Sequence, residues 1–212
     1  PADELADADL DPRAVANLVA YVTEQRTAIG VVPSDTAIVV EAFRDELGDW
    51  RVVIHSPFGV RVNAPWSLAI GAALRARTGV DPQLMPADDG IVLRLPDAED
   101  PQSAAAVRAA LTVDPGDVER ILTEQIGSTA LFAARFRECA ARALLLPRRR
   151  PDRRVPLWQQ RQRAGQLLAV ASAHGSFPIV LEAVRECLQD VYDVPALREV
   201  LRSIRDGTIQ VH

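Results

Sequence analysis

The sequence contains no lysine, so every cationic side chain other than histidine is an arginine. A P-loop needs the pattern G-x-x-x-x-G-K-[ST], in which the lysine contacts the nucleotide phosphates. A P-loop site that hydrolyses ATP or GTP is therefore excluded from these 212 residues. The 29 acidic residues outnumber the 24 basic ones. That balance argues against a protein that binds nucleic acid over its whole surface.

Cysteines and long apolar runs are also scarce. The two cysteines, Cys139 and Cys187, lie far apart and lack the close spacing of a metal site. We interpret them as core residues of a reduced, cytoplasmic protein without a metal centre. No apolar run approaches the ~18 residues of a membrane span, so no membrane partner is expected. Because the chain begins with Pro1, we expect it to be a fragment of a larger chain.

Apolar periodicity predicts an α+β fold, with N-terminal β-hairpins and a crossing helix followed by a mostly helical half. A first helix is predicted from Asp11 to about Ala28, and the crossing helix from about Ala64 to Thr78. The predicted strands are 36–43, 50–56, 83–85, 90–95 and a strand start at 208–211. Later helices are predicted near 117–125, 128–146, 157–174, 177–191 and 195–205. The polar break at 96–102 divides an α+β part (1–96) from a helical part (97–212), which we expect to form one compact unit.

The stretch from Arg51 to Trp66 links a predicted strand to the crossing helix. Asn63 is a favourable N-cap, and Pro65 suits a first helical turn. A helix N-terminus presents free N–H groups that can hold a phosphate. We therefore predict that Arg61, Asn63 and the amide of Ala64 contact phosphate, and that Trp66 stacks on a base. The alternative for Trp66 is packing on the sheet.

A second candidate region is a segment rich in arginine and proline. Its predicted nucleic-acid contacts are Arg148, Arg149, Arg150, Arg153, Arg154 and Trp158. Arg161 and Arg163 follow, and only one acid interrupts the cluster. Such a cluster needs anions nearby, which phosphates would supply. An acidic surface of another domain would also supply this negative charge. The alternatives without a ligand are that the arginine run is an ordinary solvated face and that Trp158 packs against the fold.

Three blocks of residues carry a family resemblance. They are H-S-P-F-G-V-R-V-N-A-P-W with the later D-D-G-I, then P-R-R-R-P-D-R-R-V-P-L-W-Q-Q-R-Q-R-A, then F-P-I-V-L-E-A-V-R-E-C-L-Q-D. Together they resemble the DEAD/H-associated domain of large helicase-related (Lhr) proteins. The resemblance implies an accessory domain of an ATP-dependent 3′-to-5′ DNA helicase and translocase. It also implies that ATP and Mg²⁺ belong to two motor domains of the parent chain, which a winged helix and this domain follow.

Three functional hypotheses follow. In the first, the domain grips the tracking single-stranded DNA beyond the motor. In the second, it is a structural module that docks on the motor and winged-helix domains without touching DNA. In the third, His55 and the pair Asp88–Asp89 form a small hydrolytic site, although Asp-Gly is also a strong hairpin-turn signal.

Overall fold

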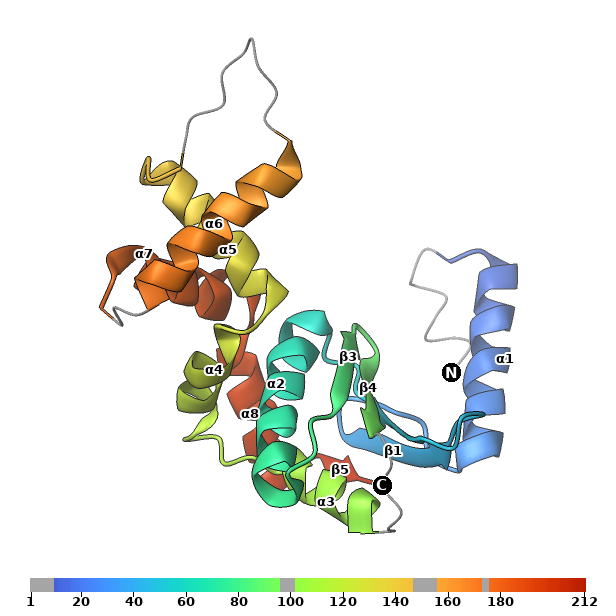
Figure 1. The fold of residues 1–212 in the computed structure, drawn as a ribbon. Coiled ribbons are helices and arrows are strands. Elements are labelled where there is room, and N and C mark those ends of the chain that lie inside the picture. Colours follow the sequence, from blue (N-terminus) through green and yellow to red (C-terminus); the bar gives the residue numbers. More distant parts are fainter. Residues whose placement is uncertain (1–9, 96–101, 147–155, 173–175) are drawn as a thin grey trace.

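The computed structural model describes residues 10–95, 102–146, 156–172 and 176–212. Within these ranges a five-stranded sheet is combined with helices, which confirms the predicted α+β class. The elements are α1 (Pro12–Ile29), β1 (Ala37–Arg44), β2 (Trp50–His55), α2 (Val60–Thr78), β3 (Gln83–Ala87), β4 (Gly90–Leu95), α3 (Gln102–Leu111), α4 (Val118–Ile126), α5 (Ala130–Arg142), α6 (Leu157–Ser172), α7 (Pro178–Arg185), the π-helix η1 (Glu186–Val191), α8 (Val194–Arg205) and β5 (Gln210–Val211). Figure 1 shows α5 and α6 extending away from the sheet on one side, and α1 standing apart on the other.

The sheet has the strand order β3-β4-β2-β1-β5. Both predicted hairpins are confirmed: β1 pairs antiparallel with β2, and β3 pairs antiparallel with β4. β2 and β4 pair antiparallel in the centre, so the two hairpins form one continuous surface. The predicted strand near the C-terminus is confirmed as β5, which runs parallel to β1.

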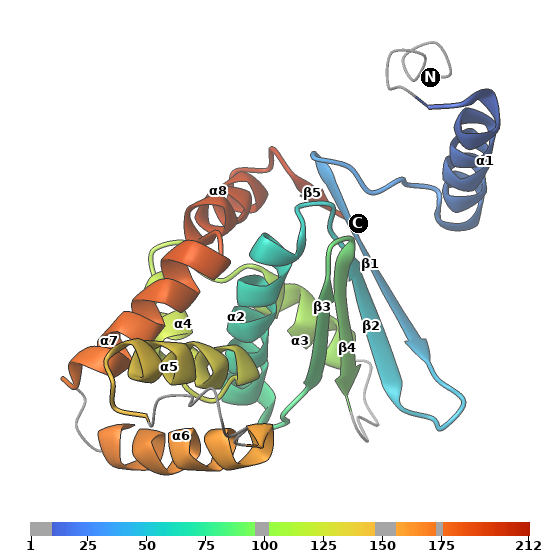
Figure 2. The same ribbon diagram turned by 90° about the horizontal axis from the view of Figure 1, so that it is seen from above.

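The core lies between one face of this sheet and α2. Ile54, Ile91 and Leu93 point from the strands into this core and have no exposed surface. Figure 2 shows α2 lying against the sheet, and α2 also contacts α3, α4 and α8. Residues from both sides of the predicted break, such as Ile70 and Leu122, belong to the same buried cluster. The β-hairpins and the later helices therefore share one apolar core.

The helical half departs from the predictions in two places. The helix α3 follows directly after the polar break and was not predicted as a separate element. The predicted helix at 177–191 divides into α7 and a π-helical stretch, η1. No helix in the described part of the chain is long and apolar enough to cross a membrane.

Candidate nucleic-acid interface

The start of α2 lies four residues before the predicted one. Gly59, with a φ of 82°, is the N-cap, so Asn63 is not the capping residue. The Val60 N–H donates to the Asp88 carboxylate (2.9 Å), and the Gly59 N–H donates to the Asp88 carbonyl (3.1 Å). A carboxylate at a helix N-terminus satisfies both the free N–H groups and the helix dipole. The turn between β3 and β4 thus supplies the anion that we had predicted a phosphate would provide.

Asn63 is completely buried and joins the strand end to this turn. Its side-chain amide accepts from the Ser56 hydroxyl (2.7 Å). Its nitrogen donates to the backbone carbonyls of Ser56 (3.1 Å), Ala87 (2.9 Å) and Asp88 (3.3 Å). The prediction that Asn63 contacts phosphate is therefore wrong, because its polar atoms are used inside the fold. The same holds for the amide of Ala64, which is the fifth residue of α2 and lies within the helical hydrogen-bond ladder.

Trp66 has no exposed surface, and its indole N–H points to the Leu111 carbonyl at 3.4 Å. The prediction that it stacks on a base is therefore wrong. The physical reason is the early start of α2, which places Val62, Trp66, Ile70 and Leu74 on one helix face at intervals of four residues. That spacing is visible in the sequence and would have identified Trp66 as a core residue.

Arg61 is exposed and connects α2 to the C-terminal helices. Its guanidinium donates to the carbonyls of Val191 (3.1 Å) and Asp190 (3.3 Å), which lie at the end of η1. A cation near the free carbonyls of a helix end is stabilising. Arg61 thus has a structural role, and its contact with phosphate stays a prediction.

The start of α6 belongs to the second predicted site, and several of its side chains are exposed to solvent. Trp158 is 63% exposed, as is its neighbour Leu157. Arg161 and Arg163 are also exposed, three and five residues after Trp158 along the helix. The predicted contacts Arg148, Arg149, Arg150, Arg153 and Arg154 lie outside the described residues, immediately before α6. Because Arg161 follows Trp158 by three residues, the arrangement places an exposed aromatic ring within one helical turn of an exposed arginine.

The third hypothesis, a hydrolytic site, gains no support from the geometry. The Asp88 carboxylate caps α2, and the His55 ring nitrogen lies 3.4 Å from the Glu41 carboxylate on the sheet face opposite α2. These groups serve local structure.

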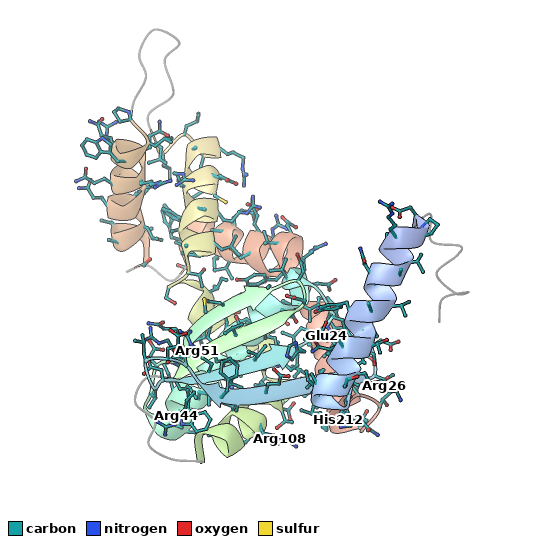
Figure 3. The ribbon with its side chains drawn as sticks, turned by 90° about the vertical axis from the view of Figure 1, so that its right-hand side faces the viewer. Glu24, Arg26, Arg44, Arg51, Arg108 and His212 are labelled. Atoms are coloured by element: carbon teal, nitrogen blue, oxygen red, sulfur yellow. The ribbon has the colours of Figure 1, made fainter. Side chains whose placement is uncertain are left out.

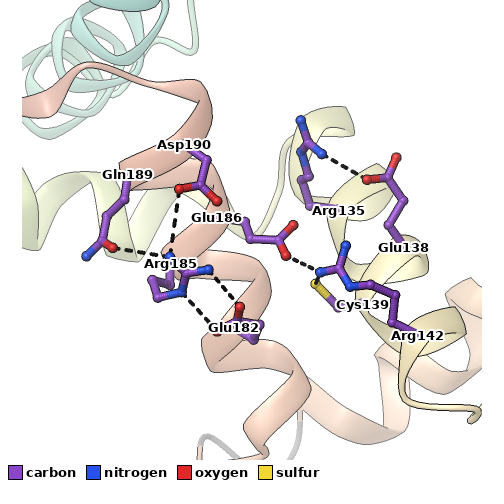
Figure 4. Close-up of polar contacts among 9 residues, drawn as sticks. All are labelled: Arg135, Glu138, Cys139, Arg142, Glu182, Arg185, Glu186, Gln189 and Asp190. Atoms are coloured by element: carbon purple, nitrogen blue, oxygen red, sulfur yellow. Dashed lines mark hydrogen bonds and ion pairs between the residues drawn. The ribbon is translucent and has the colours of Figure 1, made fainter.

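Figure 4 shows charged contacts within and between α5, α7 and η1. Arg142 of α5 pairs with Glu186 of η1, which is only 7% exposed, and also donates to the Cys139 sulfur at 3.3 Å. Arg185 pairs with Glu182 at 2.7 Å on the outer side of α7. Because a buried carboxylate needs a partner, the Arg142–Glu186 pair fixes η1 against α5.

The two cysteines are buried in this region, as the sequence predicts. Burial raises the pKa of Cys187 to about 11 and also raises the pKa of Cys139. Since the thiolate is the reactive form, we expect a chromogenic disulfide reagent at pH 8 to label neither thiol of the native protein rapidly. Urea-unfolded protein should release both equivalents at once. Fast labelling of either thiol in the native state would contradict this burial.

The fold and these surfaces define an α+β domain without a P-loop sequence. The start of its helix α6 exposes an aromatic side chain and basic side chains. The chain belongs to the DEAD/H associated family, whose sequence model matches residues 32–212. It is 57% identical over 198 residues to the Lhr helicase/probable uracil glycosylase of Mycolicibacterium smegmatis, and 50% identical over 197 residues to the Lhr helicase/uracil glycosylase of Escherichia coli. Each alignment covers 93% of this chain and 13% of the relative.

A solved structure shows the same fold. The chain is similar to Mycobacterium smegmatis helicase Lhr bound to ssDNA and AMP-PNP, with a TM-score of 0.83 and 56% identity. The match covers 93% of this chain and 25% of that chain. The 212 residues therefore correspond to a minor part of each of these larger proteins.

Proposed function

We propose that this chain is an accessory domain of an Lhr-type ATP-dependent 3′-to-5′ DNA helicase. ATP and Mg²⁺ bind to the motor domains of the larger polypeptide, and this domain contacts the single strand on which the motor moves. The family membership and the similarity to a helicase bound to ssDNA support the helicase context. The absence of lysine, and hence of a P-loop, supports an accessory rather than a motor role.

The observation that carries the strand contact is the exposure of Trp158. A tryptophan that leaves 63% of its surface in water exposes an unusually large apolar area for a folded protein. Single strands are bound by aromatic rings that stack on bases next to cationic side chains that contact phosphates. Trp158 stacks on a base in this proposal, while Arg161, Arg163 and the preceding arginine segment contact the backbone.

The proposal predicts that Trp158→Ala weakens single-stranded DNA binding about 5- to 150-fold, because one base stack contributes roughly 1–3 kcal/mol. Trp158→Phe should retain most of the affinity, since it keeps an aromatic ring. The matched control is Leu157→Ala, which truncates an equally exposed neighbour that has no ring to stack. Fluorescence anisotropy with a labelled oligonucleotide measures the affinity of all three variants.

Replacing Arg161 and Arg163 with glutamine should make DNA binding less sensitive to salt. The slope of the logarithm of the binding constant against the logarithm of the salt concentration should fall in magnitude by about 0.7 per lost phosphate contact.

A second candidate function is docking on the motor and winged-helix domains without DNA contact. The observation that favours it is that Leu157 and Trp158 together form an exposed apolar pair, which another protein surface could cover. Under this alternative, Leu157→Ala and Trp158→Ala weaken the association of the domains to a similar degree. Both then leave the affinity of the 212-residue chain for DNA unchanged, so the same three variants distinguish the two functions.

A further inference from the structure

The residues at both ends of α1 favour a helix that begins and ends at these positions. The Asp11 carboxylate caps its start by accepting from the amides of Arg13 (2.8 Å) and Ala14 (3.0 Å), and Pro12 occupies the first helical position. Gly30 ends the helix in the left-handed conformation. These are strong local signals for a helix.

The body of α1 is much less favourable than its ends. Six of its 18 residues are β-branched, which lowers helix propensity: Val15, Val19, Val22, Thr23, Thr27 and Ile29. In proteins most of the stability of a helix comes from packing of an apolar face rather than from helix propensity. None of the residues of α1 is buried, however. The helix thus lacks, within the described residues, the packing that its sequence requires.

An apolar stripe runs along one side of α1. Val15, Leu18, Val19, Val22 and Ile29 recur at the three- and four-residue spacing of one helix face. Leu18 and Val22 in its centre are 39% and 38% exposed. The opposite face carries Arg13, Asn17, Ala20 and Glu24, with Ala16 at its margin. Figure 2 shows α1 separated from the rest of the fold, joined to β1 by a short connection.

We propose that the apolar stripe of α1 docks on an apolar surface of another domain of the same polypeptide. This inference rests on the proposed function, in which the 212 residues are part of a larger helicase. The chain matches only 25% of the solved relative, which leaves ample additional polypeptide to supply that surface. The family match begins at residue 32, so α1 lies outside the residues that the family model matches.

The charge and the area of the stripe favour a domain of the same polypeptide over a nucleic acid or a separate protein as its binding partner. A nucleic-acid backbone would need several cations, whereas the only cation within the stripe is Arg26. Five apolar side chains bury on the order of 400 Å², well below the roughly 800 Å² per partner of a stable complex between separate proteins. A tethered surface needs far less area, because a short connection raises its effective concentration to roughly the millimolar range.

The test compares hydrogen exchange of the α1 amides in the full-length polypeptide and in the 212-residue chain, without ATP or DNA. Docking predicts exchange that is slower by at least about tenfold in the full-length protein. The double variant Leu18→Glu/Val22→Glu should return this exchange to the rate of the 212-residue chain. Glutamate has good helix propensity, so the variant removes docking without weakening the helix itself.

The matched control is Ala16→Glu/Ala20→Glu, which adds the same two charges outside the stripe and should keep the slow exchange. Equal exchange rates in the full-length and 212-residue proteins would overturn the proposal. So would a control variant that loses protection as fully as the stripe variant, because docking would then not depend on the apolar face. Since no DNA is present, the result is independent of whether Trp158 contacts a strand.

Discussion

Replacing Trp66 with alanine is expected to lower the free energy of unfolding by about 3–5 kcal/mol. Trp66 of α2 is fully buried in the apolar core, so truncation removes a large apolar surface and leaves a cavity. It also removes the indole donor that faces the Leu111 carbonyl. Guanidinium denaturation followed by circular dichroism measures the change. Trp66→Phe should have a smaller effect, because the ring fills part of the space but cannot donate.

The control for this experiment is Trp158→Ala, which makes the same chemical change at a side chain that is 63% exposed. We expect it to alter the free energy of unfolding by no more than about 0.5 kcal/mol. The two variants therefore distinguish a packing role from a binding role. We expect Trp66→Ala to unfold easily, and Trp158→Ala to fold normally but bind DNA weakly. Near-native stability of Trp66→Ala would show that the core position assigned to this residue is incorrect.

Local sequence signals predicted the sheet well. Runs such as Val52-Val53-Ile54 identify strands, and Asp88-Asp89-Gly90 identifies the second hairpin turn, because these patterns depend mainly on neighbouring residues. Gly30 and Gly79 likewise mark the ends of α1 and α2, where each adopts a left-handed conformation.

The start of α2 could not be predicted from local signals, because a tertiary contact decides it. Asn63 and Pro65 suggested a helix start, since an interior proline leaves the carbonyl four residues earlier without its donor. In the structure that carbonyl belongs to Arg61, and it accepts from the Asp193 N–H at 2.9 Å. The residue preceding α8 thus replaces the bond that Pro65 cannot make, and α2 continues through the proline. Only a partner distant in sequence reveals this.

Figure 3 shows Arg44 and Arg51 at one end of this side of the molecule, and Glu24, Arg26 and His212 at the other. Arg51 pairs with Asp45 at 2.8 Å, and the Arg44 guanidinium lies 5.1 Å from the centre of the Trp50 ring. These partners come from the hairpin itself, so they neutralise or shield the arginines locally. Because Arg44 and Arg51 already have partners within the hairpin, the start of α6 is the better candidate for phosphate contact.

The substitution Asn63→Asp is expected to lower the free energy of unfolding by about 2–4 kcal/mol at pH 7, although it barely changes the size of the side chain. The Asn63 nitrogen donates to three backbone carbonyls, those of Ser56, Ala87 and Asp88. An ionised carboxylate cannot donate, and it would place a buried negative charge against these oxygens. The junction between β2, the β3–β4 turn and α2 would then lose the contacts that hold it together.

The effect should depend on pH in a defined direction. Burial and the surrounding carbonyls raise the pKa of the introduced carboxyl in the folded state above its unfolded value. The protonated acid can donate again, so the penalty relative to the wild-type protein is smallest below the unfolded pKa and grows as pH rises through the folded pKa. Urea denaturation of both proteins at pH 4 and pH 7 measures this difference. The matched control is Asn17→Asp on the exposed face of α1, which should change the free energy of unfolding by no more than about 0.5 kcal/mol at either pH. If Asn63→Asp instead unfolds like the wild-type protein at pH 7 and weakens DNA binding, then Asn63 is a strand contact and the α2 start is the nucleic-acid site after all.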